Sequence, residues 1–328
     1  MKKNSIYPMI VGVILLSWTV YMTVAGQWGL FREYWGLSLT MLFGSFIAGA
    51  TPQGGAAVAF PVFTKVFQMP SADARTFGLM IQSVGMTIAA LTIWLRGVKI
   101  LPRVLLWAVL GGTAGMVLGT YFVQIPAPYP KILFTLMLTA FGIAMIVTRW
   151  VIRWDCCDAM PYWNHSTRAT FLAIGVIGGI FAAYTGAGAD ALTFVVLTLA
   201  FGVDERVSTP TTIMIMAANS LVGFFLHGVV SQDIGVAFNY WLVAIPIVII
   251  GAPLGSWVLS KIGRDTLIVG ILVLISAEFI STLILIPFNA TMLTVSIVAM
   301  LLSLGTFIIM IRYRQHKVLE QEMLVLNS

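Results

Sequence analysis

The 328-residue chain has the composition of a membrane protein, since 59% of its residues are hydrophobic and only 9% are charged. Its mean hydropathy is +0.99, and soluble globular domains carry about 25% charged residues. Soluble enzymes, disulfide scaffolds and disordered regulators are excluded, because none could keep so much apolar surface from water. The net charge of +6 comes without a basic patch containing interleaved aromatic residues, so we expect no nucleic-acid partner.

The first predicted element is a membrane-spanning helix over residues 6–26. It follows Lys2 and Lys3 but lacks a small-residue cleavage site, so it is expected to stay on the chain rather than act as a signal peptide. Apolar runs of about 20 residues between charged or proline-rich breaks predict about eight full spans in total. The predicted spans are 6–26, 74–95, 104–124, 131–149, 208–230, 236–259, 266–286 and 290–311.

Two further apolar stretches, 35–69 and 168–203, are too long for one crossing. A helix of about 35 residues would measure about 50 Å, so each stretch is expected to fold back as a broken, re-entrant hairpin. The expected breaks are GATPQGG at 49–55 and YTGAGAD at 184–190, because dense glycine and proline end helices.

The basic residues predict the orientation of these spans. If both hairpins return to their starting side, all of the 18 Lys and Arg residues lie on the inner side except Arg32, Lys65, Arg75 and Lys131. The positive-inside rule places such a basic side in the cytoplasm. Both termini are therefore expected to be cytoplasmic.

An internal repeat relates the two halves of the chain. Gly44, Thr51 and Gly54 align with Gly178, Thr185 and Gly188, so the two break motifs coincide. Each unit is a hairpin followed by three spans, and an odd number of spans inverts the second copy. The predicted organisation is 1–34 (first helix and outer loop), 35–150 (repeat 1), 151–167 (cytoplasmic linker), 168–288 (repeat 2) and 289–328 (last helix and tail).

Inverted repeats with interrupted helices indicate a secondary transporter whose substrate lies between the breaks. Free N–H groups at a restarted helix, with the positive end of its dipole, attract anions. Hydroxyl and amide side chains of the spans that follow each hairpin either line this site or form interhelical hydrogen bonds. The candidate substrate-binding residues are Thr51, Gln53, Gly54, Gly55, Gln82, Ser83, Thr185, Gly186, Gly188, Ala189 and Asn219.

The break motifs GATPQGGAAVAFPVF and AYTGAGADALTFVVL resemble those of the TauE/SafE family of sulfite exporters and sulfonate permeases. The resemblance covers roughly residues 35–312. It implies transport of a small sulfur oxyanion or organosulfonate across a bacterial inner membrane. Thr51-Pro52-Gln53 and Asp190 depart from the family's glycine-only pattern.

Two acidic residues are candidates for coupling transport to a proton or a co-transported cation. Asp190 either caps the helix that restarts there or changes its charge state during transport. Glu278 lies within a span, where an acid is either a protonatable relay or a carboxylic acid bonded to a neighbouring helix. The sequence leaves the coupling ion, the direction of transport and the oligomeric state open.

Other functions have less support in the sequence. An anion channel could share the repeat and the anion-attracting helix ends. An intramembrane enzyme would need a motif such as HExxH or GxSxG, and a primary pump would need GxxxxGK[ST], but the chain contains none of these. We therefore expect a transporter without catalytic residues, metal or cofactor.

Overall fold

The computed structural model describes residues 3–52, 62–63, 67–152 and 156–326, and its regular elements there are helices. Nine of the described helices are long and apolar enough to cross a membrane. The expected class, an all-α polytopic membrane protein, is confirmed.

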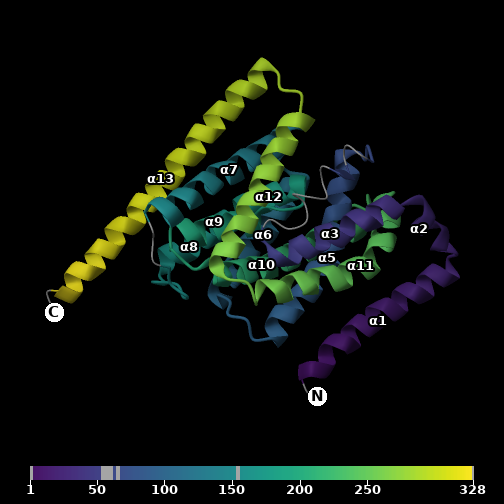
Figure 1. The fold of residues 1–328 in the computed structure, drawn as a ribbon. Helices are drawn as coiled ribbons and strands as arrows, with labels where there is room; N and C mark the ends of the chain where they lie inside the picture. The colour runs from purple at the N-terminus through teal and green to yellow at the C-terminus, as the bar shows by residue number, and fades with distance from the viewer. Residues whose placement is uncertain (1–2, 53–61, 64–66, 153–155, 327–328) are drawn as a thin grey trace.

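The helices follow one another in the predicted order (Figure 1). Short irregular turns extend α7 through Val147–Val151 and α10 through Leu226–Val230. The helices are α1 (Lys3–Val24), α2 (Leu30–Glu33), α3 (Trp35–Ala50), α5 (Ser71–Leu95), α6 (Pro102–Tyr121), α7 (Tyr129–Ile146), α8 (His165–Thr185), α9 (Ala189–Leu199), α10 (Glu205–Phe225), α11 (Ala237–Leu259), α12 (Arg264–Leu285) and α13 (Ala290–Leu326).

The ninth long helix is α8, the first arm of the second predicted hairpin. It has 21 residues. It starts as early as His165, because the side chain of Asn164 caps it there by accepting a hydrogen bond from the Thr167 N–H at 2.8 Å. The helix thus starts before Arg168, where the apolar stretch begins. The second hairpin consists of one full-length helix and the 11-residue α9, rather than two short arms.

The second stretch folds back as expected. After α9 the chain returns to the side on which α8 begins. There Gly202 O accepts the N–H of Cys157, in the linker before α8, at 3.0 Å, and the ring of Phe201 stacks on Phe171 of α8. From Phe171 to Thr185, α8 rises about 21 Å, less than the roughly 30 Å thickness of the hydrocarbon core. The break after Thr185 therefore lies within the apolar bundle.

The first stretch returns to its starting side as well. The Phe67 ring lies directly against Gly36 in the first turn of α3. Residues 53–61 and 64–66, which include the predicted Gln53, Gly54 and Gly55, lie outside the described part of the chain.

Close glycine contacts set the directions of the central helices. Gly111, Gly115 and Gly119 of α6 lie against successively later residues of α8, from Leu172 to Ile180, so these two helices are parallel. Ser38 and Gly49 of α3 meet Val243 and Ala252 of α11 in the same sense.

The helices α5 and α10 run antiparallel where they cross. Leu79 lies against Gly223, and Gln82 bonds Ser220. Because α5 runs with α11 and α10 runs with α6, α3 and α8 point in opposite directions. This is the arrangement that an inverted repeat requires, and descent from one duplicated unit stays a prediction.

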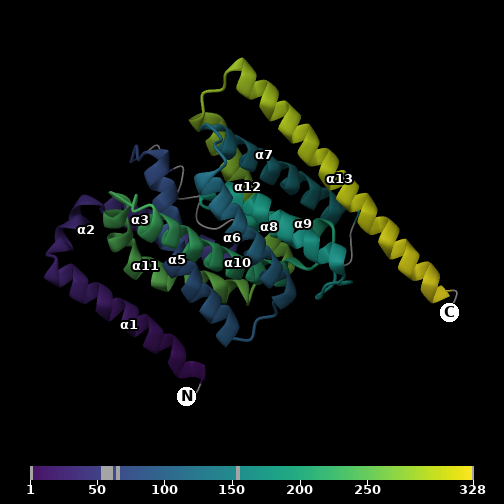
Figure 2. The same ribbon diagram turned by 180° about the vertical axis from the view of Figure 1, so that it is seen from behind.

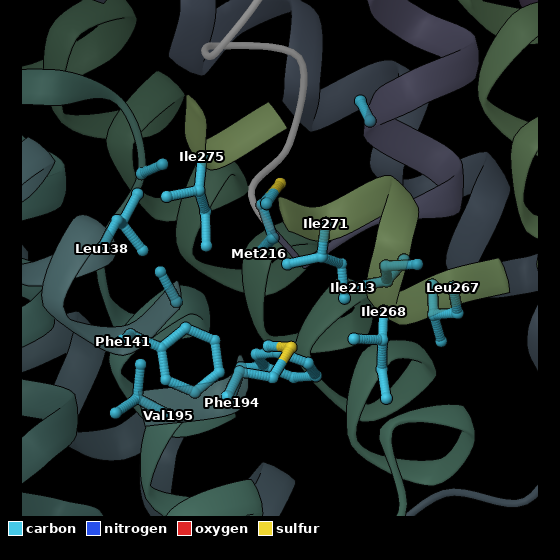
Figure 3. Close-up of a cluster of buried hydrophobic side chains, with 14 of the residues drawn as sticks. Leu138, Phe141, Phe194, Val195, Ile213, Met216, Leu267, Ile268, Ile271 and Ile275 are labelled. Atoms are coloured by element: carbon cyan, nitrogen blue, oxygen red, sulfur yellow. The ribbon is translucent and has the colours of Figure 1, made fainter. Parts of the chain in front are cut away.

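The short helix α9 lies at the centre of the largest apolar cluster. Phe194 and Val195 pack among side chains of α7, α10 and α12 (Figure 3). Phe141 meets the Phe194 ring edge-on at 5.6 Å between centroids. The interrupted element is thus surrounded by protein, which a broken helix at membrane depth requires.

The first and last helices flank this bundle on opposite sides (Figures 1 and 2). Only 6% of the α1 span and 11% of the α13 span is buried. Both helices are apolar, so their outward faces are suited to contact lipid.

Replacing Gly179 with valine should destabilise the bundle. Its added Cβ would collide with backbone atoms of Gly112, Gly115 and Met116, and overpacking typically costs about 1–3 kcal/mol. Thermal unfolding in detergent measures the loss. Gly270→Val is the matched control, because no described atom lies within 4 Å of a Cβ there. Equal stability of the two variants would contradict the packing described.

Candidate functional site

A small cavity lies between the two halves of the protein. It has a volume of about 40 Å³, enough for ordered water, and its walls are mostly apolar. The first half contributes α3, α5 and Phe63, and the second contributes Thr185 and α11. The lining residues are Met41, Gly44, Ser45, Ala48, Phe63, Ala74, Phe77, Gly78, Ile81, Gln82, Gly85, Met86, Thr185, Val248 and Ala252.

Among the described residues, three polar side chains line this cavity. Gln82 and Thr185 were predicted from the sequence, and Ser45 was not. Ser45 Oγ is buried and has no hydrogen-bond partner among the described residues. A buried hydroxyl without a hydrogen-bond partner costs free energy, so a ligand or a water molecule in this cavity would be stabilised by a hydrogen bond to Ser45.

The first break follows α3 directly. Thr51 adopts an extended conformation and ends the helix, while its hydroxyl donates to Ile47 O at 3.0 Å. Ala48, one turn earlier, lines the cavity. The predicted role of Thr51 in substrate binding stays a prediction.

The second break is closed by its own residues. Gly186 ends α8 in the left-handed region at φ +80°, a conformation that favours glycine. Thr185 Oγ1 donates to Ala187 O at 2.6 Å. Gly188 lies so close to α8 that a Cβ would collide with Gly178 O, so the small residues allow the chain to double back here.

Asp190 accepts hydrogen bonds from backbone amides around the start of α9. Its Oδ1 accepts the Gly188 N–H at 2.8 Å, and the Ala191 amide also bonds this carboxylate. Its Oδ2 is buried and has no partner among the described residues. An anion at this helix start would therefore compete with a carboxylate already in place. These contacts match a capping role, and a change in the charge of Asp190 during transport stays a prediction.

Asn219 lies next to this break. Its amide packs against Gly112 of α6. One turn earlier on α10, Ile215 packs with Ala108 of α6 and Ala189 of α9. Neither Asn219 Oδ1 nor Nδ2 has a partner in the described part of the chain. The adjacent Ser220 donates to Gln82 Oε1 at 3.0 Å, so α10 connects the second break to the cavity.

Not every predicted residue joins this region. Ser83 donates to Met80 O in its own helix at 2.7 Å. Glu278 lies on α12, where Lys131 and Thr135 of α7 donate hydrogen bonds to its Oε1. This bonding matches the structural alternative for Glu278, and its role in coupling stays a prediction.

Arg75 is a basic residue of this region that the sequence placed only on the outer side, near the start of the predicted span 74–95. It belongs to the first turn of α5, and its Nη1 donates to Ala183 O at 3.3 Å, just before the second break. Sequence position gave no signal of this contact, because the side chain reaches another helix.

The sulfite exporter TauE/SafE family model matches residues 37–282. The chain belongs to the TauE/SafE family. No individual characterised protein and no solved structure matches the chain significantly. The match includes both breaks and the helices between them, and it places the chain among multi-pass membrane transporters. The helices α1 and α13 lie outside the TauE/SafE match.

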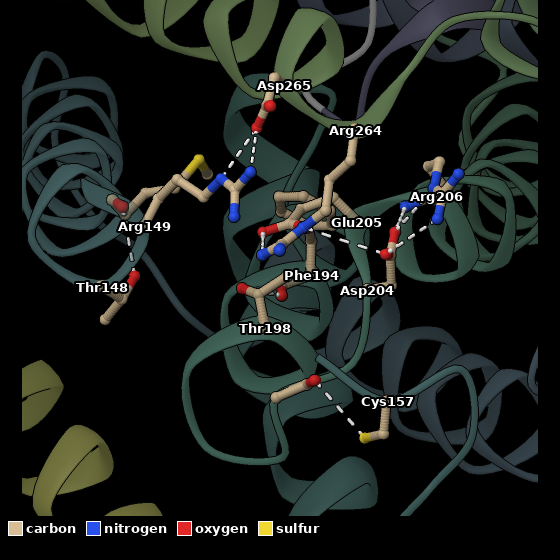
Figure 4. Close-up of polar contacts among 12 residues, drawn as sticks. Thr148, Arg149, Cys157, Phe194, Thr198, Asp204, Glu205, Arg206, Arg264 and Asp265 are labelled. Carbon is tan, nitrogen blue, oxygen red and sulfur yellow. Dashed lines mark hydrogen bonds and ion pairs between the residues drawn. The ribbon is translucent and has the colours of Figure 1, made fainter. Parts of the chain in front are cut away.

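A polar cluster on the side of the linker ties the TauE/SafE core together (Figure 4). Arg264 at the start of α12 donates to Glu205 at 2.5 and 3.2 Å, and Arg206 bonds Asp204. Arg149 of the α7 extension donates to Asp265 at 2.5 and 2.8 Å. These contacts hold the ends of α7, α10 and α12 together on the side where the linker begins.

The linker packs against the same cluster. Cys157 forms an isolated parallel bridge with Val203, and its neighbour Cys156 is partly buried near Arg314. Burial raises the pKa of the Cys156 thiol to about 11. The described linker residues Cys156 and Cys157 are thus packed against the protein.

Removing Lys131 should destabilise the protein through its partner. Lys131→Met would leave the Glu278 carboxylate buried, a loss of about 3–5 kcal/mol. Adding Glu278→Gln should recover most of this loss, because the buried charge is then gone. Unfolding in detergent measures both effects, with Lys261→Met, at an exposed site, as control. A double variant as unstable as the sum of the single losses would contradict this pairing.

Cys156 should react slowly with maleimide near neutral pH. The thiolate is the nucleophile, and a pKa of about 11 leaves little thiolate below pH 9. Labelling of a Cys157→Ser variant should rise steeply between pH 9 and 11 and become fast at pH 8 after unfolding in SDS. Rapid labelling of the folded protein at pH 7 would contradict the burial of Cys156.

Proposed function

We propose that this protein is a secondary transporter of a small anion, most specifically a sulfur oxyanion or an organosulfonate. Family membership supports this substrate class. The observation that carries the mechanism is the cavity shared by α3, which ends at the first break, and Thr185, which begins the second. A site formed jointly by two halves can open to either side as the halves move, which is alternating access.

A carrier fits this geometry better than a channel. The cavity is about 40 Å³, and the ends of α7, α10 and α12 are joined by ion pairs on the linker side. A channel requires a continuous polar path, whereas a carrier alternates between closed arrangements. We also propose a non-enzymatic role in the bacterial inner membrane, with both termini cytoplasmic.

Asp190 is the proposed coupling residue. Its carboxylate is buried at the break, with one oxygen bonded to backbone amides and the other without a partner among the described residues. An ionised carboxylate there repels an anionic substrate and is costly to bury. Taking up a proton or a cation removes this repulsion, so substrate binding and ion uptake favour each other.

Flux into proteoliposomes tests the proposed function. Purified protein should transport labelled sulfite, thiosulfate or a sulfonate with saturation kinetics, and an imposed proton gradient should change the rate. Carboxylates of similar size serve as comparison substrates. Flux that rises linearly with concentration would favour a channel, and absence of flux for every sulfur anion would overturn the proposal.

The Asp190→Asn variant tests the coupling. The side-chain oxygen of the introduced asparagine can still accept the Gly188 N–H, so the fold should persist, but no group is left to change its charge. The variant should lose the pH dependence of its saturated flux. Asp158→Asn is the matched control, because that carboxylate is 64% exposed in the linker. An unchanged pH profile in the Asp190 variant would eliminate the coupling role.

A further inference from the structure

Arg75 lies beside the second break, at the end of α8. Its Nη1 bonds Ala183 O in the last turn of α8. Its own backbone oxygen is the described atom nearest to a Cβ built on Gly186, at 3.9 Å. Ala74, the residue before Arg75, and Gly78, three residues after it, line the cavity together with Thr185.

The guanidinium retains unused hydrogen-bonding capacity. Arg75 Nε is buried and has no partner among the described residues. Because Nη1 is engaged with Ala183, the edge formed by Nε and Nη2 is the one left to bind a ligand. This edge presents two parallel N–H groups, the geometry that matches two oxygens of one oxyanion.

The neighbouring groups leave this charge without a carboxylate partner. Asp73, Tyr184 and Asp233 are the groups near enough to influence Arg75. Asp233 bonds His227 Nδ1 at 2.9 Å, and the Tyr184 hydroxyl donates to Val123 O. No ion pair joins Arg75 to an acid within the described ranges of the chain.

We propose that Arg75 recognises the anion at the second break, binding two oxygens of a sulfite or sulfonate group through Nε and Nη2. This inference rests on the proposed function. In this proposal Arg75, rather than the backbone amides around the start of α9, is the principal anion contact, because Asp190 already accepts the Gly188 and Ala191 amides. Arg75 also favours oxyanions over halides, since a single-atom anion cannot engage both N–H groups in parallel.

The competing role for Arg75 is purely structural, as a side chain that caps the carbonyl end of α8. The two roles differ in what a substitution changes. Loss of a cap lowers the stability of the substrate-free protein and leaves substrate affinity unchanged. Loss of an anion contact raises KM and removes stabilisation by the anion.

The test compares Arg75→Gln and Arg75→Lys with the wild type and with Arg32→Gln, a control at an exposed arginine of α2. Sulfite flux gives KM and the maximal rate. Thermal unfolding with added sulfite, sulfate or chloride gives binding without transport. We expect Arg75→Gln to raise KM about tenfold or more, Arg75→Lys to raise it less, and Arg32→Gln to match the wild type.

Stabilisation by sulfite, absent with chloride, should disappear in Arg75→Gln. An unchanged KM with lower stability in the absence of sulfite would overturn the inference and leave the transporter proposal intact. If Arg75→Gln does not fold, Arg75→Lys carries the test, because a wild-type KM in that variant would equally overturn bidentate recognition. A wild type that neither moves nor is stabilised by any sulfur anion would overturn both proposals.

Discussion

The structure depends on one constraint, which is that backbone polar groups released inside an apolar bundle must find partners within the protein. The second break meets this constraint with very short-range contacts. Gly186 ends α8 in a left-handed turn, the Thr185 hydroxyl bonds Ala187 O, and Asp190 accepts the N–H of Gly188, the residue before α9. The broken segment can then be buried on all sides by α7, α10 and α12.

Satisfying the backbone in this way determines the electrostatics of the region. A carboxylate is stabilised at a helix start, yet it places negative charge where an anionic substrate would bind. The oxygen of Asp190 left without a described partner makes that charge costly to retain. A proton or cation at Asp190 and a guanidinium nearby are the two ways to make the region attractive to an anion, and Arg75 places such a group beside the break.

Small residues connect this local solution to the arrangement of the halves. The contacts of Gly115 with Val176, and of Gly255 with Phe46, let α6 approach α8 and α11 approach α3 at backbone distance. In lipid, such close packing supplies much of the attraction between helices, because burying apolar side chains gains little there. Glycine therefore forms many of the close contacts between the halves. The polar residues Gln82, Ser220 and Asn219 lie near them, since Ser220 of α10 bonds Gln82 of α5 and Asn219 packs against Gly112 of α6.

The sequence by itself determined the membrane class, the positions of eight of the nine long apolar helices among the described residues and the positions of the two breaks, because hydropathy and glycine clusters act over neighbouring residues. It also located Gln82, Thr185, Asp190 and Asn219 near those breaks. Only the tertiary structure decided that Lys131 pairs with Glu278, that α8 is a full-length helix, and that Arg75 reaches the second break. The physical reason is the length of the side chains. Lysine and arginine reach several ångströms to groups more than a hundred residues away in the chain, and which partner they meet depends on how helices pack, a property that no local pattern records.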